Sequence, residues 1–334
     1  MPSDSNLIEV RNLVKYFPVY ERGILMQKQT GVVHAVDDIT FNIRSGETLA
    51  LVGESGCGKT TTARLLLNLI EPTRGTVLFR GENVLEKFNS KSKKERLAQR
   101  RKMQLVFQNP YGSLDPRMTV FDIISEPFLI HRHVKRREWK NRVYDLLELV
   151  GLEEYHAERY PHEFSGGQRQ RICIARALAV EPEFLVLDEP VSSLDVSIRA
   201  QILNLLADLQ EKIGLTYLYI SHDLSSVRQI SHRVAVMYLG QIVELAETDE
   251  LFSKPLHGYT QALIKAVPIP DPKTKYLKVV LPGEVPSPIN PPEGCRFHPR
   301  CPYNSENCKK YVPNLQEVRS GHWVACATQY KARM

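Results

Sequence analysis

The sequence predicts an α/β fold with a mostly parallel β-sheet, and three features support this. Short apolar runs alternate with segments of helical periodicity, which is the pattern that builds parallel sheets. A glycine-rich stretch, 53–60, lies between one such run and a helical pattern. Residues 115–160 are helical in pattern without a buried strand, so we expect an inserted helical subdomain. The apolar runs are 47–52, 103–107, 184–189 and 216–221.

The chain begins with a pattern of antiparallel strands. Residues 7–14 and 32–43 alternate or run apolar, and they enclose a charged, turn-rich segment at 17–31 that we predict to be a loop. We therefore expect an N-terminal antiparallel β-subdomain that leads into the sheet.

Length and charge limit the class of protein. The 334 residues exceed what one compact core needs, so a large domain with smaller additions is expected. No stretch approaches roughly 20 consecutive apolar residues and no signal peptide is apparent, which predicts a cytoplasmic protein.

The formal charge of +6 is concentrated at 87–102 and 132–142. These clusters lack interleaved aromatic residues, so we interpret them as a solvated helical face.

The stretch GESGCGKT at 53–60 has the features of a phosphate-binding loop. Glycines let backbone N–H groups approach an anion, and the following helix directs its positive end at the same charge. Lys59 is predicted to reach the β- and γ-phosphates of a nucleotide, and Thr60 to bind Mg²⁺. The predicted nucleotide contacts here are Gly53, Glu54, Ser55, Gly56, Cys57, Gly58, Lys59, Thr60 and Thr61.

Two carboxylates follow the apolar run at 184–187. Asp188 is expected to hold Mg²⁺ at the end of a buried strand, and Glu189 to orient or deprotonate an attacking water.

A second helix begins after Ser165, where Gly166, Gly167 and Gln168 precede an apolar helical pattern. That helix start provides a second site suited to phosphate.

These motifs occur in a characteristic order. The phosphate loop, SGGQ at 165–168, VLDEP at 186–190, SSLD at 192–195 and SHD at 221–223 together resemble the ATP-binding subunit of an ATP-binding cassette (ABC) transporter. The resemblance covers roughly residues 7–250. It implies a P-loop ATPase core at 1–90 and 163–250, with the connecting segment 91–162 forming the helical subdomain.

The resemblance also implies roles for single residues. Gln108 contacts Mg²⁺ and the attacking water, and His222 holds the γ-phosphate. Phe17, or alternatively Tyr16, stacks on adenine. Two ATPase subunits close head to tail, so that each nucleotide is also contacted by residues of the other subunit. The residues acting across that interface are Ser165, Gly166, Gly167, Gln168 and Asp195.

The C-terminal segment, 251–334, is rich in proline and contains four cysteines. Short helical segments are expected at 251–255 and 260–267, and the dense proline that follows, at 267–272 and 281–294, predicts an extended segment without regular structure. Four thiolates suit either zinc or an iron–sulfur cluster, and from the residues alone both alternatives remain. This extension is similar to that of oligopeptide and dipeptide importers, and the likeness favours a [4Fe–4S] cluster. The expected ligands are Cys295, Cys301, Cys308 and Cys326.

The resemblance implies an ATPase that drives peptide import, corresponding to the second of two paralogous ATPase subunits. Its expected partners are that paralogue, or a second copy of this chain when it is isolated, and two membrane permeases. A coupling helix of the permeases is expected to enter a cleft beside the helical subdomain, and an extracytoplasmic peptide-binding protein acts indirectly. Its expected location is the inner face of the membrane. Nickel or sugar import is an alternative within the same fold, and a nucleic-acid-associated ATPase is a further one. The sequence does not identify the cargo.

Overall fold

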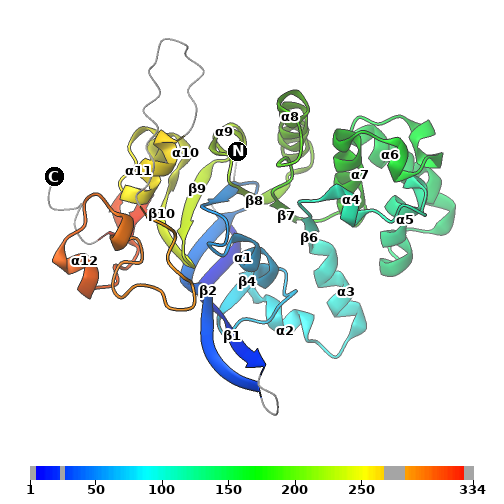
Figure 1. Cartoon of the computed structure of the whole chain (residues 1–334). Helices are drawn as coiled ribbons and strands as arrows, with labels where there is room; N and C mark the ends of the chain where they lie inside the picture. The colour runs from blue at the N-terminus through cyan, green and yellow to red at the C-terminus, as the bar shows by residue number, and fades with distance from the viewer. Residues whose placement is uncertain (1–4, 23–26, 267–282, 327–334) are drawn as a thin grey trace, which may run out of the picture.

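The computed structural model describes residues 5–22, 27–266 and 283–326, and its strands form two sheets (Figure 1). A four-stranded antiparallel sheet has the order β2-β1-β4-β5, and an eight-stranded mixed sheet has the order β11-β12-β10-β9-β3-β8-β7-β6. The strands are β1 (Asn6–Arg22), β2 (Gln27–Arg44), β3 (Thr48–Val52), β4 (Arg74–Phe79), β5 (Glu82–Asn83), β6 (Met103–Val106), β7 (Phe184–Asp188), β8 (Thr216–Ser221), β9 (Arg233–Tyr238), β10 (Gln241–Glu247), β11 (Gln316–Arg319) and β12 (His322–Val324).

Helices cover the larger sheet and form most of the inserted subdomain. None of the helices within the described ranges is both long and apolar enough to cross a membrane. The α-helices are α1 (Lys59–Leu66), α2 (Val84–Phe88), α3 (Lys93–Lys102), α4 (Pro110–Ser113), α5 (Val120–His131), α6 (Trp139–Leu149), α7 (Gly166–Leu178), α8 (Val196–Ile213), α9 (Leu224–Ile230), α10 (Thr248–Ser253), α11 (Gly258–Lys265) and α12 (Glu306–Lys310).

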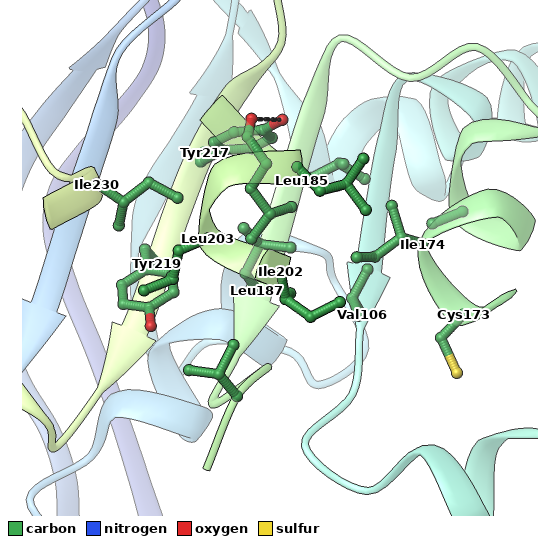
Figure 2. Close-up of a cluster of buried hydrophobic side chains, with 14 of the residues drawn as sticks. Val106, Cys173, Ile174, Leu185, Leu187, Ile202, Leu203, Tyr217, Tyr219 and Ile230 are labelled. Atoms are coloured by element: carbon green, nitrogen blue, oxygen red, sulfur yellow. Dashed lines mark hydrogen bonds between the residues drawn. The ribbon is translucent and has the colours of Figure 1, made fainter. Parts of the chain in front are cut away.

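The parallel strands of the larger sheet are buried on both faces. On β7, Leu185 and Leu187 join one apolar cluster, whereas Phe184 and Val186 join the other. Figure 2 shows Leu185 and Leu187 beside Ile202 of α8, in the cluster that also reaches the helical subdomain. Such two-sided burial explains why these strands read as continuous apolar runs. The carboxyl ends of these parallel strands meet at one edge of the sheet. Ligands of parallel sheets bind at that edge.

The N-terminal hairpin differs from the prediction in two ways. The segment 17–31 was expected to be a loop, but β1 continues to Arg22 and β2 starts at Gln27, with Tyr20 paired to Gln29. Main-chain hydrogen bonds between paired strands do not depend on side-chain polarity, which is why composition was misleading. The hairpin also belongs to its own antiparallel sheet and does not enter the larger one.

The helical subdomain and the C-terminal extension lie at opposite ends of the molecule (Figure 1). Helices α4 to α7 lie beyond the β6 edge, and β6 itself, within 91–162, belongs to the larger sheet. The extension contains regular structure that the sequence did not predict, because β12 pairs with β10 and β11 pairs with β12. Part of its proline-rich stretch, 267–282, lies outside the described residues.

Candidate nucleotide-binding site

The loop between β3 and α1 has the backbone that a phosphate cradle requires. Gly58, the residue before α1, has φ of +111°, and a Cβ there would lie 2.2 Å from the carbonyl oxygen of Ala35. A side chain at this position is therefore excluded both by backbone conformation and by space. Burial of β3 fixes one end of the loop, and the helix begins directly at its other end.

Lys59 points back into the loop, and Thr60 points toward the end of β7. Lys59 is buried, and its Nζ donates to the carbonyl oxygens of Gly53 (2.7 Å) and Glu54 (3.0 Å). Thr60 donates through Oγ1 to Oδ1 of Asp188 at 3.3 Å. Burial raises the pKa of Asp188, and the hydrogen bond from Thr60 opposes that shift. A hydroxyl beside a buried carboxylate is a donor set that suits Mg²⁺.

Glu189 stands at the centre of a polar triad. Its Oε2 accepts a hydrogen bond from Nε2 of Gln108 at 2.8 Å, and its Oε1 lies 3.1 Å from Nδ1 of His222. Its backbone has φ of +48°, which is uncommon for a residue other than glycine and turns the chain sharply after β7. Three chain segments thus meet at one carboxylate beyond the ends of the parallel strands.

These groups surround one cavity of about 660 Å³. Phe17, the phosphate loop, Gln108, Glu189 and His222 all contribute to its wall. The side chains of Tyr16, Glu54 and Cys57 do not line it. The lining residues are Phe17, Val33, Ala35, Ser55, Gly56, Gly58, Lys59, Thr60, Thr61, Gln108, Glu189, His222 and Pro288.

The two aromatic candidates for adenine stacking occupy different environments. Phe17 lines the cavity and is 38% exposed. Tyr16 instead donates through its hydroxyl to Asp37 at 2.5 Å and packs on the ring of His34. Burial and the neighbouring carboxylate raise the pKa of Tyr16 to about 12. Neighbouring residues of a strand point to opposite faces, so only Phe17 faces the cavity.

The helix that begins after Ser165 lies away from this cavity. Ser165 and Gln168 cap each other: Oγ of Ser165 accepts from the backbone N–H of Gln168, and Oε1 of Gln168 accepts from that of Ser165. A Cβ on Gly167 would lie 2.3 Å from Ile198 of α8, so α7 and α8 pack too closely for a side chain there. Ser165 is exposed, and so is Asp195, the residue that caps α8.

Sequence reasoning missed several contacts that come from the C-terminal part of the chain. Pro288 lines the cavity and accepts a hydrogen bond from the backbone N–H of His34 at 2.9 Å. The hydroxyl of Tyr259 accepts one from the backbone N–H of Glu54 at 2.8 Å. These partners lie more than 200 residues from the segments they contact, and no local motif marks them.

The four C-terminal cysteines lie near one another but form no metal site in this structure. Burial, together with a smaller effect of the other three thiols, raises the pKa of Cys295 to about 11. The backbone N–H of Cys295 donates to the carbonyl oxygen of Cys308 at 2.8 Å. Within the described ranges, no group of three or more His, Cys, Asp or Glu side chains is arranged to hold a metal ion. The predicted iron–sulfur cluster therefore receives no support from the geometry.

Comparison with protein families gives two matches along the chain. Residues 36–192 match the ABC transporter family, and residues 243–308 match the C-terminal region of oligopeptide/dipeptide transporters. The chain is 50% identical over 326 residues to the oligopeptide transport ATP-binding protein AppF of Bacillus subtilis (strain 168), covering 97% of this chain and 98% of the relative. It is 48% identical over 320 residues to the dipeptide transport ATP-binding protein DppF of Haemophilus influenzae (strain ATCC 51907 / DSM 11121 / KW20 / Rd), covering 96% of each.

Solved structures support the same assignment. The cbiO1 protein of Clostridium perfringens, part of the ABC transporter complex cbiONQ, has a TM-score of 0.62 at 26% identity, covering 75% of this chain and 92% of that one. The ATP-binding cassette MJ0796, solved as a dimer bound to ADP and Pi, has a TM-score of 0.61 at 28% identity, covering 72% of this chain and 98% of that one. The chain therefore belongs to the family of ATP-binding proteins of oligopeptide and dipeptide ABC transporters.

Proposed function

We propose that this chain is the ATP-hydrolysing subunit of an importer of dipeptides and oligopeptides. The observation that carries the proposal is the single cavity in which the phosphate loop, Glu189 and His222 face one another. The relatives named for oligopeptide and dipeptide transport match this chain along nearly its whole length, including the extension. Peptide cargo is therefore favoured over nickel or sugar.

We assign the site residues as follows. Phe17 stacks on adenine, and the backbone of 55–60 with Lys59 binds the phosphates. Thr60, Asp188 and Gln108 hold Mg²⁺, which when bound neutralises charge on the phosphate oxygens. The hydroxyl of Thr60 already contacts Asp188, so the donors are close to the arrangement that the ion requires.

Hydrolysis needs a water positioned to attack the γ-phosphorus on the side opposite the leaving ADP. The carboxylate of Glu189 accepts the proton of that water, and Gln108, which donates to the same carboxylate, fixes its orientation. His222 lies on the other side of Glu189 and donates to the γ-phosphate. Because all three side chains line the cavity, the attacking water and the phosphate can be contacted at once.

We further propose that the active form is a head-to-tail pair of this chain and a paralogous ATPase. The residues Ser165, Gly166, Gly167 and Gln168 lie outside the walls of their own nucleotide cavity, and Ser165 is exposed. A capped helix start with free access is suited to bind the γ-phosphate held by a partner. Asp195 would lie at the same interface.

A second cavity, of about 320 Å³, supports the proposed contact with a permease. It lies between the larger sheet and the helical subdomain, and its walls include Leu69, Phe107 and Ile130. These three apolar side chains are each about half exposed, at 48%, 51% and 52%. A short apolar helix of a membrane subunit would cover them, which would hold the ATPase at the inner membrane face.

The function is tested by reconstituting the chain with its paralogue and permeases in liposomes. Dipeptides or oligopeptides, delivered by the binding protein, are expected to stimulate ATP hydrolysis and to enter the vesicles. An unrelated solute, such as nickel or a sugar, serves as the control. Stimulation by that solute without any response to peptides would overturn the assignment of cargo and leave the ATPase assignment intact.

We also propose that the four cysteines bind a [4Fe–4S] cluster, on the chemistry of the donor set. Four thiols within 32 residues, of which three lie near enough to Cys295 to raise its pKa, suit such a cluster. Purification without oxygen is expected to yield iron and sulfide in near-equal amounts, and replacing Cys301 by serine is expected to remove them. Zinc without sulfide would contradict the proposal.

A further inference from the structure

The C-terminal extension contacts the nucleotide site through two buried arginines that lie between Cys295 and Cys301. Arg300 makes a bidentate contact with the carboxylate of Glu54, the second residue of the phosphate loop. Its Nη1 lies 2.8 Å from Oε2 and its Nη2 lies 3.2 Å from Oε1. Paired hydrogen bonds between a guanidinium and a carboxylate fix direction as well as distance.

Glu54 is held from three sides. Arg300 binds its carboxylate, the hydroxyl of Tyr259 accepts from its backbone N–H, and its carbonyl oxygen accepts from Nζ of Lys59. Arg300 and Tyr259 approach from the C-terminal part of the chain, whereas Lys59 approaches from the cavity side. The loop backbone is thus fixed from two directions. Lys59, which faces the phosphates, holds it on the cavity side, and Arg300 and Tyr259 hold it from the C-terminal part of the chain.

The second arginine reaches the adenine side of the site. Arg296 pairs with Asp37 of β2 and donates to the carbonyl oxygen of Leu239. Asp37 in turn accepts the hydroxyl of Tyr16, the neighbour of Phe17 on β1. Both arginines are buried, and Arg296 is 7% exposed, so solvent screens these contacts little.

We propose that Arg300 and Arg296 are positioning residues for ATP, through which the C-terminal extension sets the shape of the nucleotide site. Arg300 orders the phosphate loop through Glu54, and Arg296 orders the adenine side through Asp37. Pro288, from the same extension, completes the cavity wall. The inference rests on the proposed ATP site. An ordered loop loses less conformational freedom when the nucleotide binds, so ATP affinity depends on these contacts.

Replacing Arg300 by glutamine tests this in the full-length protein. The dissociation constant for ATP with Mg²⁺ is expected to rise by at least about fivefold, measured by titration calorimetry. Arg300→Lys, which keeps the charge but not the paired geometry, is expected to give an intermediate value. Lys309→Gln is the matched control, since Lys309 pairs with Glu306 on the exposed surface of the same extension, and it should bind ATP as the wild type does.

A double-mutant cycle separates positioning from general stabilisation. Glu54→Gln is expected to weaken ATP binding as Arg300→Gln does, and the double variant to be no weaker than either single variant. A lower melting temperature with unchanged ATP affinity would overturn the inference, as would additive losses. If Arg300→Gln does not fold, the same double-mutant cycle is measured with Arg300→Lys in its place, combined with Glu54→Gln. The same outcomes then support or overturn the inference. A wild-type chain that binds no ATP would instead refute the proposed function.

Discussion

Replacing Glu189 by glutamine is expected to reduce ATP hydrolysis by about 10²- to 10⁴-fold while leaving ATP affinity nearly unchanged. The amide has the same shape and can still hydrogen-bond Gln108 or His222, but it cannot accept the proton of the attacking water. In the proposed pair of ATPase subunits, hydrolysis removes the phosphate contacts that the two subunits share. The variant should therefore accumulate as an ATP-bound closed dimer, detected by gel filtration with light scattering.

Two comparisons make the Glu189 result specific. Glu211→Gln, an exposed position on α8, should hydrolyse ATP at the wild-type rate. Adding Ser165→Arg to Glu189→Gln should prevent the ATP-dependent dimer, because the large side chain blocks the exposed helix start that we assign to the partner's phosphate. Unchanged turnover in Glu189→Gln would remove this residue from the role of base.

Much of the site was predictable because its chemistry is encoded in short segments. Lys59 follows its glycines directly, and Asp188 and Glu189 follow an apolar strand, so their placement depends only on local elements. In the structure Lys59 and Glu189 line one cavity together with Gln108 and His222. Parallel α/β topology makes that convergence a general rule.

The features that the sequence did not reveal are contacts between residues far apart in the chain or on different strands. Phe17 and Tyr16 are adjacent in sequence, and only the pairing of β1 with β2 determines which of them faces the cavity. The pair of Arg300 with Glu54 joins residues 246 positions apart. Such contacts depend on how the extension packs on the core, for which no short motif exists.

The cysteines show that spacing predicts possible ligands but not their arrangement. Their number and crowding in a proline-rich tail predict a ligand set, whereas Cys295 and Cys301 pack against the main apolar cluster and, among the residues that the structure describes, no group of three or more side chains is arranged to hold a metal ion. Spacing along the chain does not determine how four thiols converge, because backbone turns between them set the geometry. Chemical analysis of iron, sulfide and zinc in the purified protein therefore determines whether the cysteines bind a metal, which their spacing alone does not.

Replacing Lys59 by alanine is expected to weaken ATP binding itself, in contrast to Glu189→Gln. A hydrogen bond to a charged group contributes about 1.5–3 kcal/mol, which corresponds to about 10- to 150-fold in the dissociation constant. The loss has a second source, since Nζ of Lys59 also bonds the carbonyl oxygens of Gly53 and Glu54 and so orders the loop.

Titration calorimetry of Lys59→Ala with ATP and Mg²⁺ measures this loss, and Lys212→Ala, an exposed lysine on α8, is the matched control. Because Lys59 is buried, the melting temperature of each variant must be recorded alongside the affinity. A folded Lys59→Ala protein with wild-type affinity would show that the loop does not bind the phosphates as proposed. A selective loss of affinity would instead place the phosphate charge beside Lys59, which lines the cavity and whose Nζ is held by the loop carbonyls.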